Sequence, residues 1–194
     1  MCYFFCVIRA FVAIEIPEDV RTALGEAQLR LKQAHPNVKV SWAKIGNLHL
    51  TLQFLGSIGE SAAPRISQSL ATGVAAVPTF SVPVAGVGAF PDIDRPRVLW
   101  IGCNDSNGKL RALAQVVQAA LRPCGFKPEP VPWVPHFTLG RIRSVQVDPA
   151  LTHALDSLTN ETFGTLPVTE IHLFQSQLQA EGSVYTKLSS HALQ

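Results

Sequence analysis

Two kinds of segment alternate along the chain. Segments rich in β-branched and aromatic residues predict strands, and segments whose apolar residues recur at helical spacing predict helices. The expected strands are 9–16, 38–42, 49–55, 80–90, 97–103, 170–175 and 184–188, with one more beginning at His136. The expected helices run from Glu18 to before Pro36 and over 60–76, 106–121 (capped by Ser106) and 149–158.

The order of these elements favours one fold class. Strands and helices are interleaved, but proline-rich links and hairpin-like strand pairs argue against a regular parallel sheet. We therefore expect an α+β fold with two similar lobes. No low-complexity tract or obvious linker separates independent domains.

Composition and charge narrow the class of protein. The chain has 194 residues, of which 47% are hydrophobic and 15% are charged, with a formal net charge of +2. Such a chain can bury a large core and is not disordered. The small net charge excludes strong nonspecific nucleic-acid binding over the whole surface. Local basic groups remain at Arg95, Arg97, Arg141 and Arg143.

Two features bear on the compartment. The four cysteines form no CxxC pair and show no zinc-finger spacing, which favours a reducing cytosol. The apolar start of the chain lacks a basic leading region, is interrupted by Arg9, and is too short for a membrane span. We interpret it as a buried strand preceded by a short extension, and we expect a cytoplasmic protein.

One pattern occurs twice, with its histidines 136 − 49 = 87 residues apart. The first copy is His49-Leu50-Thr51-Leu52 and the second is His136-Phe137-Thr138-Leu139. Because side chains alternate along a strand, histidine and threonine share one face of each copy, and the apolar residues share the other. Each strand would therefore cover a core while presenting an imidazole beside a hydroxyl.

This pair of groups suits a phosphate. A hydroxyl donates to a phosphoryl oxygen, and an imidazole moves a proton near neutral pH. Two facing copies would supply a general acid and a general base for opening a phosphodiester, without a metal if positive donors offset the charge. Two alternatives stay open: ordinary strand residues that satisfy one another, and a zinc site with both histidines as ligands.

The motifs with their flanks resemble the 2H phosphoesterase superfamily, and within it the RNA 2′,3′-cyclic phosphodiesterases, also called 2′-5′ RNA ligases. The resemblance rests on the opening strand at 9–14, the first block at 40–56, the strand 97–102, the second block at 135–141 and the closing hairpin with Gly182 and Tyr185. It implies one domain, residues 1–194, of two pseudo-symmetric lobes of mostly antiparallel sheet, with outer helices around a central cleft. Residues 1–8 would form an N-terminal extension.

The resemblance also implies a reaction, which is metal-independent hydrolysis of an RNA 2′,3′-cyclic phosphate end to a 2′-phosphomonoester, with reverse ligation at the same centre. His49 would be the general acid and His136 the general base. Thr51 and Thr138 would hold the phosphate, and Arg141 would offset its charge. No cofactor is implied, and the expected enzyme is a monomer that acts in RNA processing without a membrane.

Strict alternation places Arg141 on the opposite face from His136, unless a bulge at Gly140 turns it back. For the other histidines we expect structural positions. His35 lies at a helix end, His153 on a surface helix and His191 in a frayed terminus, and His172 faces solvent or the rim of the site. The aromatic side chains that are candidates for stacking on a base are Phe11, Trp42 and Trp133.

Two other functions stay open. One is a 2H phosphodiesterase acting on a small cyclic nucleotide or on an ADP-ribose cyclic phosphate. The other is a noncatalytic RNA-binding module, although intact histidines and threonines in both copies argue against it. A polymeric substrate would need basic surface beyond the pocket, and the candidates for this surface are Arg95, Arg97 and Arg143.

Overall fold

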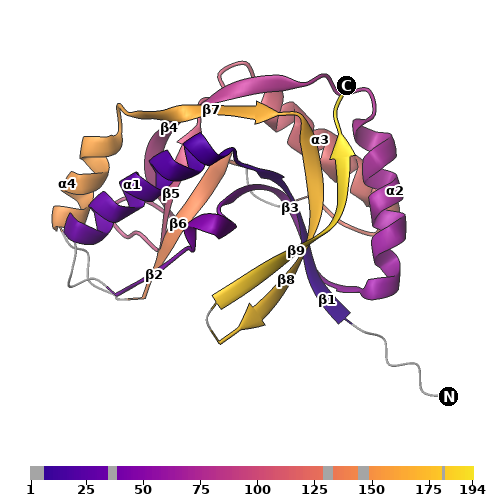
Figure 1. Cartoon of the computed structure of the whole chain (residues 1–194), viewed down its shortest axis with the longest axis horizontal. Coiled ribbons are helices and arrows are strands. Elements are labelled where there is room, and N and C mark those ends of the chain that lie inside the picture. The colour runs from indigo at the N-terminus through magenta and orange to yellow at the C-terminus, as the bar shows by residue number, and fades with distance from the viewer. Residues whose placement is uncertain (1–6, 35–38, 129–132, 144–148, 181) are drawn as a thin grey trace.

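The computed structural model describes residues 7–34, 39–128, 133–143, 149–180 and 182–194. Two sheets form its centre, and helices lie outside them (Figure 1). The four-stranded sheet has the order β3-β1-β8-β9, and the five-stranded sheet has the order β2-β6-β5-β4-β7. The proposed extension falls mostly on residues 1–6, which lie outside the described residues, whereas Val7 and Ile8 belong to the first strand.

Both sheets are antiparallel throughout their described pairings. The strands of the first sheet are β1 (Val7–Glu15), β3 (His49–Gly59), β8 (Glu170–Gln179) and β9 (Gly182–Ala192). Those of the second are β2 (Val40–Trp42), β4 (Phe80–Phe90), β5 (Val98–Cys103), β6 (His136–Ile142) and β7 (Thr162–Val168). The expected α+β class is confirmed.

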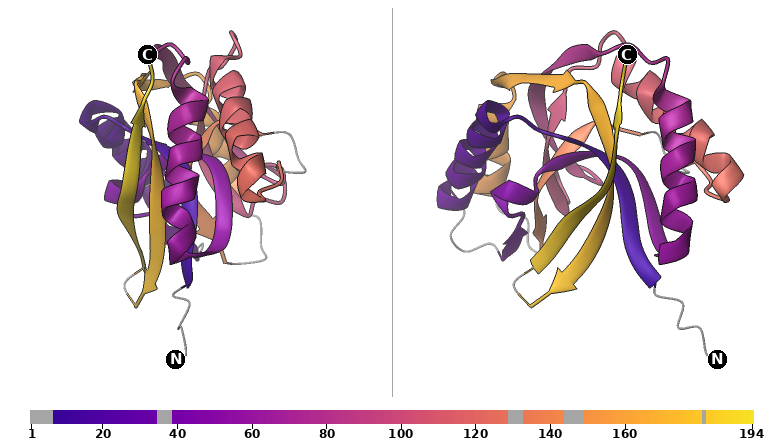
Figure 2. Two further views of the ribbon diagram at one scale, coloured as in Figure 1. Left: turned by 90° about the vertical axis from the view of Figure 1, so that its right-hand side faces the viewer. Right: turned by 45° about the vertical axis from the view of Figure 1, so that its right-hand side comes forward.

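The helices cover the outer faces of the sheets (Figure 2). Helices α1 (Glu18–Ala34) and α4 (Pro149–Leu158) pack on the five-stranded sheet, and α2 (Ala63–Val74) and α3 (Lys109–Leu121) pack on the four-stranded one. Short 3₁₀ turns lie at η1 (Ile45–Asn47), η2 (Glu60–Ala62) and η3 (Arg122–Cys124). Helix α1 follows a strand of the four-stranded sheet and covers the five-stranded one, and α3 does the reverse, so these two helices cross from one sheet to the other.

Several boundaries differ from expectation for local physical reasons. Strand β7 was not expected, because it contains Gly164 and Pro167, and both residue types are uncommon inside strands. Strand β3 does not end at Gly56 but continues to Gly59, with Gly56 at φ +66° beside an irregularity in pairing. Helix α3 begins at Lys109, and it is Asp105, not Ser106, whose carboxylate accepts from its first backbone N–H groups.

One continuous apolar core joins the two layers. Four α3 residues that recur at helical spacing are essentially buried, namely Leu110, Leu113, Val117 and Leu121. The apolar residues of both His-Thr strands, such as Leu50 and Phe137, also lie fully in this core. The opposite face of each strand, which carries the histidine and the threonine, is therefore turned away from the core. None of the helices in the described ranges has the length and apolar character needed to cross a membrane.

Candidate active site

The two His-Thr pairs lie on neighbouring strands. β3 and β6 contact each other, although they belong to different sheets. His49, Thr51, His136 and Thr138 are all half-buried, while the residues between them are buried. Trp133 also ties the two strands together, because its indole N–H donates to the carbonyl of Thr51 at 3.0 Å. The strands thus bring both imidazoles and both hydroxyls to one region.

Both histidines are held by the same local device. The Nδ1 of His49 lies 2.7 Å from the carbonyl oxygen of Asn47, and the Nδ1 of His136 lies 2.8 Å from that of Val134. A carbonyl can only accept, so each Nδ1 carries the proton. Each Nε2 is therefore the nitrogen available to gain or lose a proton at the site.

Burial and a neighbouring charge lower the pKa of both imidazoles. Burial lowers the pKa of His49 below its ordinary value; the hydrogen bond to Asn47 opposes this, and the charge of His136 lowers the pKa further. Burial likewise lowers the pKa of His136, against the hydrogen bond to Val134, with an added lowering from the Arg141 guanidinium. Free imidazole forms are therefore favoured near neutral pH, and a bound anion would shift both groups toward protonation.

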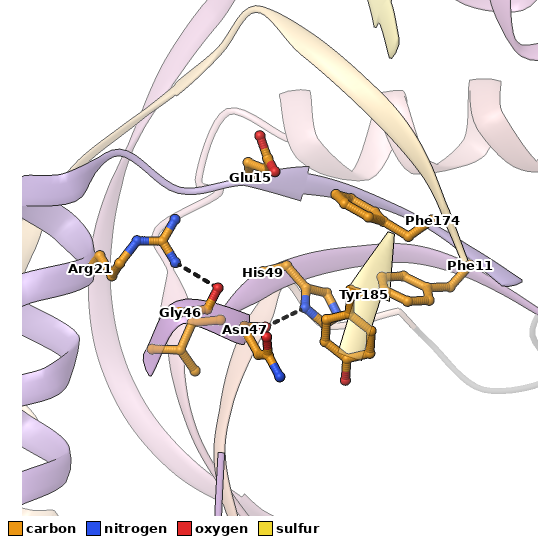
Figure 3. A pocket seen from close by; sticks show the side chains of 9 residues that line it. Phe11, Glu15, Arg21, Gly46, Asn47, His49, Phe174 and Tyr185 are labelled. Atoms are coloured by element: carbon orange, nitrogen blue, oxygen red, sulfur yellow. Dashed lines mark hydrogen bonds between the residues drawn. The ribbon is translucent and has the colours of Figure 1, made fainter. Parts of the chain in front are cut away.

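Aromatic rings surround His49. Phe11 stacks on its imidazole at 4.7 Å between centroids, and Tyr185 meets it edge-on at 5.1 Å. These rings and Phe174 line a pocket beside His49, together with polar groups such as Glu15 and Arg21 (Figure 3). The pocket gives the imidazole one apolar wall and one polar wall.

The turn before His49 is fixed by side chains on both sides. Arg21 of α1 donates to the carbonyls of Ile45 and Gly46, each at 3.2 Å. Asn47 donates from its side chain to the carbonyl of Ser183, at the start of β9, at 2.7 Å. Asn47 therefore joins the hairpin that carries Tyr185 to the backbone that orients His49. Figure 3 shows the bond between His49 and Asn47.

His136 has aromatic neighbours of its own. Phe90 meets its ring edge-on at 4.9 Å, and Trp100 lies at 6.3 Å. Both residues come from the adjacent antiparallel strands β4 and β5. Each histidine is thus packed against rings of its own sheet, which limits its rotation.

A bulge sets the direction of Arg141. Opposite β5, Thr138 pairs with Trp100 and Gly140 pairs with Leu99, so Leu139 is an extra residue in β6. Leu139 and Gly140 are consequently both buried, and Arg141 is exposed on the face of His136 and Thr138. Strict alternation alone was wrong here, and the turning-back of Arg141 comes from this irregularity next to Gly140.

β3 carries the same irregularity at the matching place. Thr51 pairs with Ala13 and Gln53 pairs with Val12, so Leu52 is the extra residue. The burial sequences of 49–55 and 136–142 are identical, and Phe54 takes the place of Arg141. Phe54 is 59% exposed and pairs across the strands with Phe11.

Phe54 was missed as a site residue by the sequence analysis. Alternation from His49 places it with the buried residues, and only an alignment of the two motifs, His-x-Thr-Leu-x-Phe with His-x-Thr-Leu-x-Arg, could have matched it to Arg141. Asn47 was also missed, since a turn asparagine has no pattern that reveals a partner 136 residues away.

The aromatic residues first considered for base stacking are all engaged. Phe11 is buried among other rings, and Trp133 is bonded to Thr51. Trp42 packs over Gly140 and lies under the Lys32 ammonium, 5.5 Å from its ring. Phe54 is more exposed on this face than Phe11, Trp42 or Trp133.

The predictions for two further histidines were wrong. His172 is only 1% exposed and His191 is 7% exposed. His172 contacts the hydroxyl of Ser190 at 2.9 Å, with Glu15 and Glu170 within 4 Å, because β8 is an inner strand with both faces covered. His153 is exposed on α4, as expected, and His35 lies outside the described residues. The described residues contain no group of three His, Cys, Asp or Glu side chains that could hold a metal ion.

Comparison with known proteins agrees with this geometry. An RNA 2′,3′-cyclic phosphodiesterase of Aeropyrum pernix is 36% identical over 162 residues, which is 84% of this chain and 91% of that protein. A protein of the same name from Methanothermobacter thermautotrophicus is 30% identical over 181 residues, covering 93% of this chain and 96% of the relative.

Solved structures have the same fold. The crystal structure of TT0787 from Thermus thermophilus superposes with a TM-score of 0.79 at 28% identity, covering 96% of this chain and 98% of the other. Escherichia coli LigT complexed with 3′-AMP gives a TM-score of 0.75 at 25% identity, with 97% and 99% coverage.

The sequence profile described as LigT like phosphoesterase matches residues 14–100 and also residues 101–185. Each matched stretch holds one His-x-Thr strand, in agreement with the repeated bulge and burial pattern of β3 and β6. The expected family and the expected class of hydrolase are therefore confirmed, and this chain belongs to the LigT-like phosphoesterases.

Proposed function

We propose that the protein hydrolyses RNA 2′,3′-cyclic phosphate ends to 2′-phosphomonoesters, using His49 and His136 as its proton-transfer pair. The observation that carries this proposal is the shared setting of the two histidines. Each histidine is bonded through Nδ1 to a backbone carbonyl. Burial lowers the pKa of both, and the charge of His136 lowers the pKa of His49 further. The relatives named RNA 2′,3′-cyclic phosphodiesterase support the choice of substrate.

The proposed reaction is a single displacement at phosphorus. Water attacks the phosphorus of the cyclic ester, and Nε2 of His136 takes the proton of that water. The bond from phosphorus to the 3′ oxygen breaks, and Nε2 of His49 donates its proton to this oxygen. The products are a 2′-phosphate and a 3′-hydroxyl. The threonine hydroxyls of Thr51 and Thr138 hold the phosphoryl oxygens, and Arg141 offsets the charge that develops on them.

Ligation follows from the same groups, as a displacement in the same direction as hydrolysis but with another nucleophile. A 5′-hydroxyl in place of water would give a 2′-5′ linkage, with the roles of the two histidines unchanged. All the proposed groups come from one chain, so a monomer can carry out the reaction. Both halves of the chain supply groups to the site, so they act as one domain. A reducing cytoplasm, where RNA ends are processed, is the proposed location.

The test uses an RNA oligomer that ends in a 2′,3′-cyclic phosphate, incubated with the protein in EDTA. We expect a 2′-phosphate product, and a loss of rate of at least about 10²-fold for His49→Ala and for His136→Ala. His153→Ala, which changes an exposed histidine on α4, is the matched control and should keep full activity. Loss of activity in EDTA, or full activity in either active-site variant, would overturn the proposal.

A small cyclic nucleotide is the second candidate substrate. The observation that favours it is that Escherichia coli LigT, a structural neighbour, was crystallised with 3′-AMP. Comparing a 2′,3′-cyclic mononucleotide with the oligomer in the same assay separates the two candidates. An ADP-ribose cyclic phosphate is tested in the same way.

A further inference from the structure

We propose that Arg143, with Ser41, binds the internucleotide phosphate next to the cyclic end, so that the site recognises an RNA chain rather than a mononucleotide. This inference rests on the proposed function and defines its substrate class. It starts from the bulge at Leu139, which places Arg141 on the face of His136 and Thr138.

The altered alternation continues past Arg141. Ile142, the last residue of β6, is 7% exposed and points into the core. The backbone N–H of Arg143 still donates to the carbonyl of Lys39, so the pairing with the segment of β2 continues and Arg143 returns to the face of Arg141. The Nε of Arg143 donates to the hydroxyl of Ser41 at 3.0 Å, and Ser41 is the cross-strand partner of Arg141. One strand face thus presents His136, Thr138, Arg141 and Arg143 in order, leading outward from the catalytic pair.

The spacing fits consecutive phosphates. Residues two apart in a strand are separated by about 6.6 Å along it, so Arg143 stands one step beyond the group that would hold the reacting phosphate. The bond to Ser41 uses the Nε–H and leaves the terminal amino groups of the guanidinium for an anion. β2, which carries Ser41, is the edge strand of its sheet, so among the described residues no further strand pairs beyond it.

Charge also favours an anion here. Arg141 and Arg143 are both exposed, and neither forms an ion pair with a carboxylate among the described residues. Lys39 adds a third exposed cation. It lies beside Arg143, because its backbone carbonyl accepts from the backbone N–H of Arg143 at 2.7 Å. Arg95, an earlier candidate, instead lies 3.9 Å from Asp92 in the connection between β4 and β5.

The experiment compares two substrates that share one reacting end. kcat/KM is measured for a 2′,3′-cyclic mononucleotide and for a trinucleotide with the same cyclic end, each over a range of salt concentrations. We expect Arg143→Gln to lower kcat/KM about tenfold on the trinucleotide and to leave the mononucleotide unchanged. The slope of log(kcat/KM) against log salt for the trinucleotide should fall by about 0.7, the value for one phosphate contact on a single strand.

Two control variants separate the effect of the Arg143 charge from a general effect of losing a surface arginine. Arg143→Lys keeps the charge and should keep the salt slope, and Arg111→Gln, which changes an exposed arginine on α3, should leave both substrates unaffected. An equal loss on both substrates, or no loss on the trinucleotide, would overturn the inference while leaving the proposed function intact. If the unaltered protein hydrolyses neither substrate, the proposed function fails, and the inference fails with it.

Discussion

The two active-site histidines predict a pH profile. Both pKa values lie below the ordinary value of about 6.5, and the reaction needs one imidazole protonated and the other free. Above both pKa values the protonated partner is lost as pH rises, so kcat/KM should have its optimum below pH 6.5. It should then fall by up to about tenfold per pH unit toward pH 8. A flat profile between pH 6.5 and 8 would contradict this two-histidine mechanism.

Arg141 should move that profile. Its positive charge lowers the pKa of His136, so Arg141→Gln should shift the limb that belongs to His136 to higher pH, besides lowering the rate. Arg141→Lys, which keeps the charge, should leave the limb in place. A profile that keeps its position in Arg141→Gln would show that the guanidinium does not act on His136.

Gln28 bonds to the bulged backbone that turns Arg141 toward the site. Its side chain is 1% exposed and donates to the carbonyls of Ala43 and of the bulged Leu139, at 2.8 and 3.0 Å. We expect Gln28→Leu to lower the free energy of unfolding by about 1–3 kcal/mol, because these carbonyls lose a buried donor, and to lower kcat/KM. Chemical denaturation measures the first effect. Gln33→Leu, on the exposed side of the same helix, should change stability by less than about 0.5 kcal/mol.

Single residues also show what a sequence pattern can and cannot give. The pattern predicted the common face of His49 and Thr51, because that face depends only on local alternation. It failed for His172, because burial of a polar residue between apolar neighbours depends on which strands and helices cover both sides of β8. The bonds of Gln28 to β6 are equally invisible, since 111 residues separate it from Leu139.

At the level of elements, the bulge in β6 depends on a glycine. A Cβ at Gly140 would lie 2.8 Å from Val40 Cγ1 and 2.9 Å from Trp42 Cε3. Gly140→Ala should therefore push β2 away and cost about 1–3 kcal/mol, seen as a lower Tm in a thermal melt. Gly59→Ala, where only the Ser61 hydroxyl lies near at 3.8 Å, is the control and should melt like the unaltered protein. Equal Tm values for both variants would show that β2 yields without cost.

Elements were predictable where their pattern was unbroken. Helix α1, strand β4 and helix α4 follow the expected limits closely, since their apolar spacing is regular and their ends carry clear signals. A bulge at Gly140 was raised only as one possibility for β6, and the bulge in β3 was not raised, because a single extra residue leaves the composition of a strand unchanged and alters only its pairing. The face of Arg141 thus needed the paired strands, not the one strand alone.

At the level of the whole molecule, two helices that cross from one sheet to the other make the sheets depend on each other. α1 follows β1 of the four-stranded sheet but covers the five-stranded one, and α3 follows β5 of the five-stranded sheet but covers the four-stranded one. We expect one cooperative unfolding transition, with the same Tm from far-ultraviolet circular dichroism and from tryptophan fluorescence. The fluorescence comes from Trp42, Trp100 and Trp133, which lie in or just before strands of the five-stranded sheet. An earlier fluorescence transition would mean that this sheet opens independently.

The exchange of phenylalanine for arginine at matching places of β3 and β6 has a stereochemical consequence. A cyclic phosphate has two ester oxygens that differ little around phosphorus. A site with identical halves would accept it in either of two orientations, cleave either bond, and release a mixture of 2′- and 3′-phosphates. With a ring at one end and a cation at the other, the nucleoside and the chain have different places to lie. On the proposed function, this broken symmetry is what gives the product a single isomeric form.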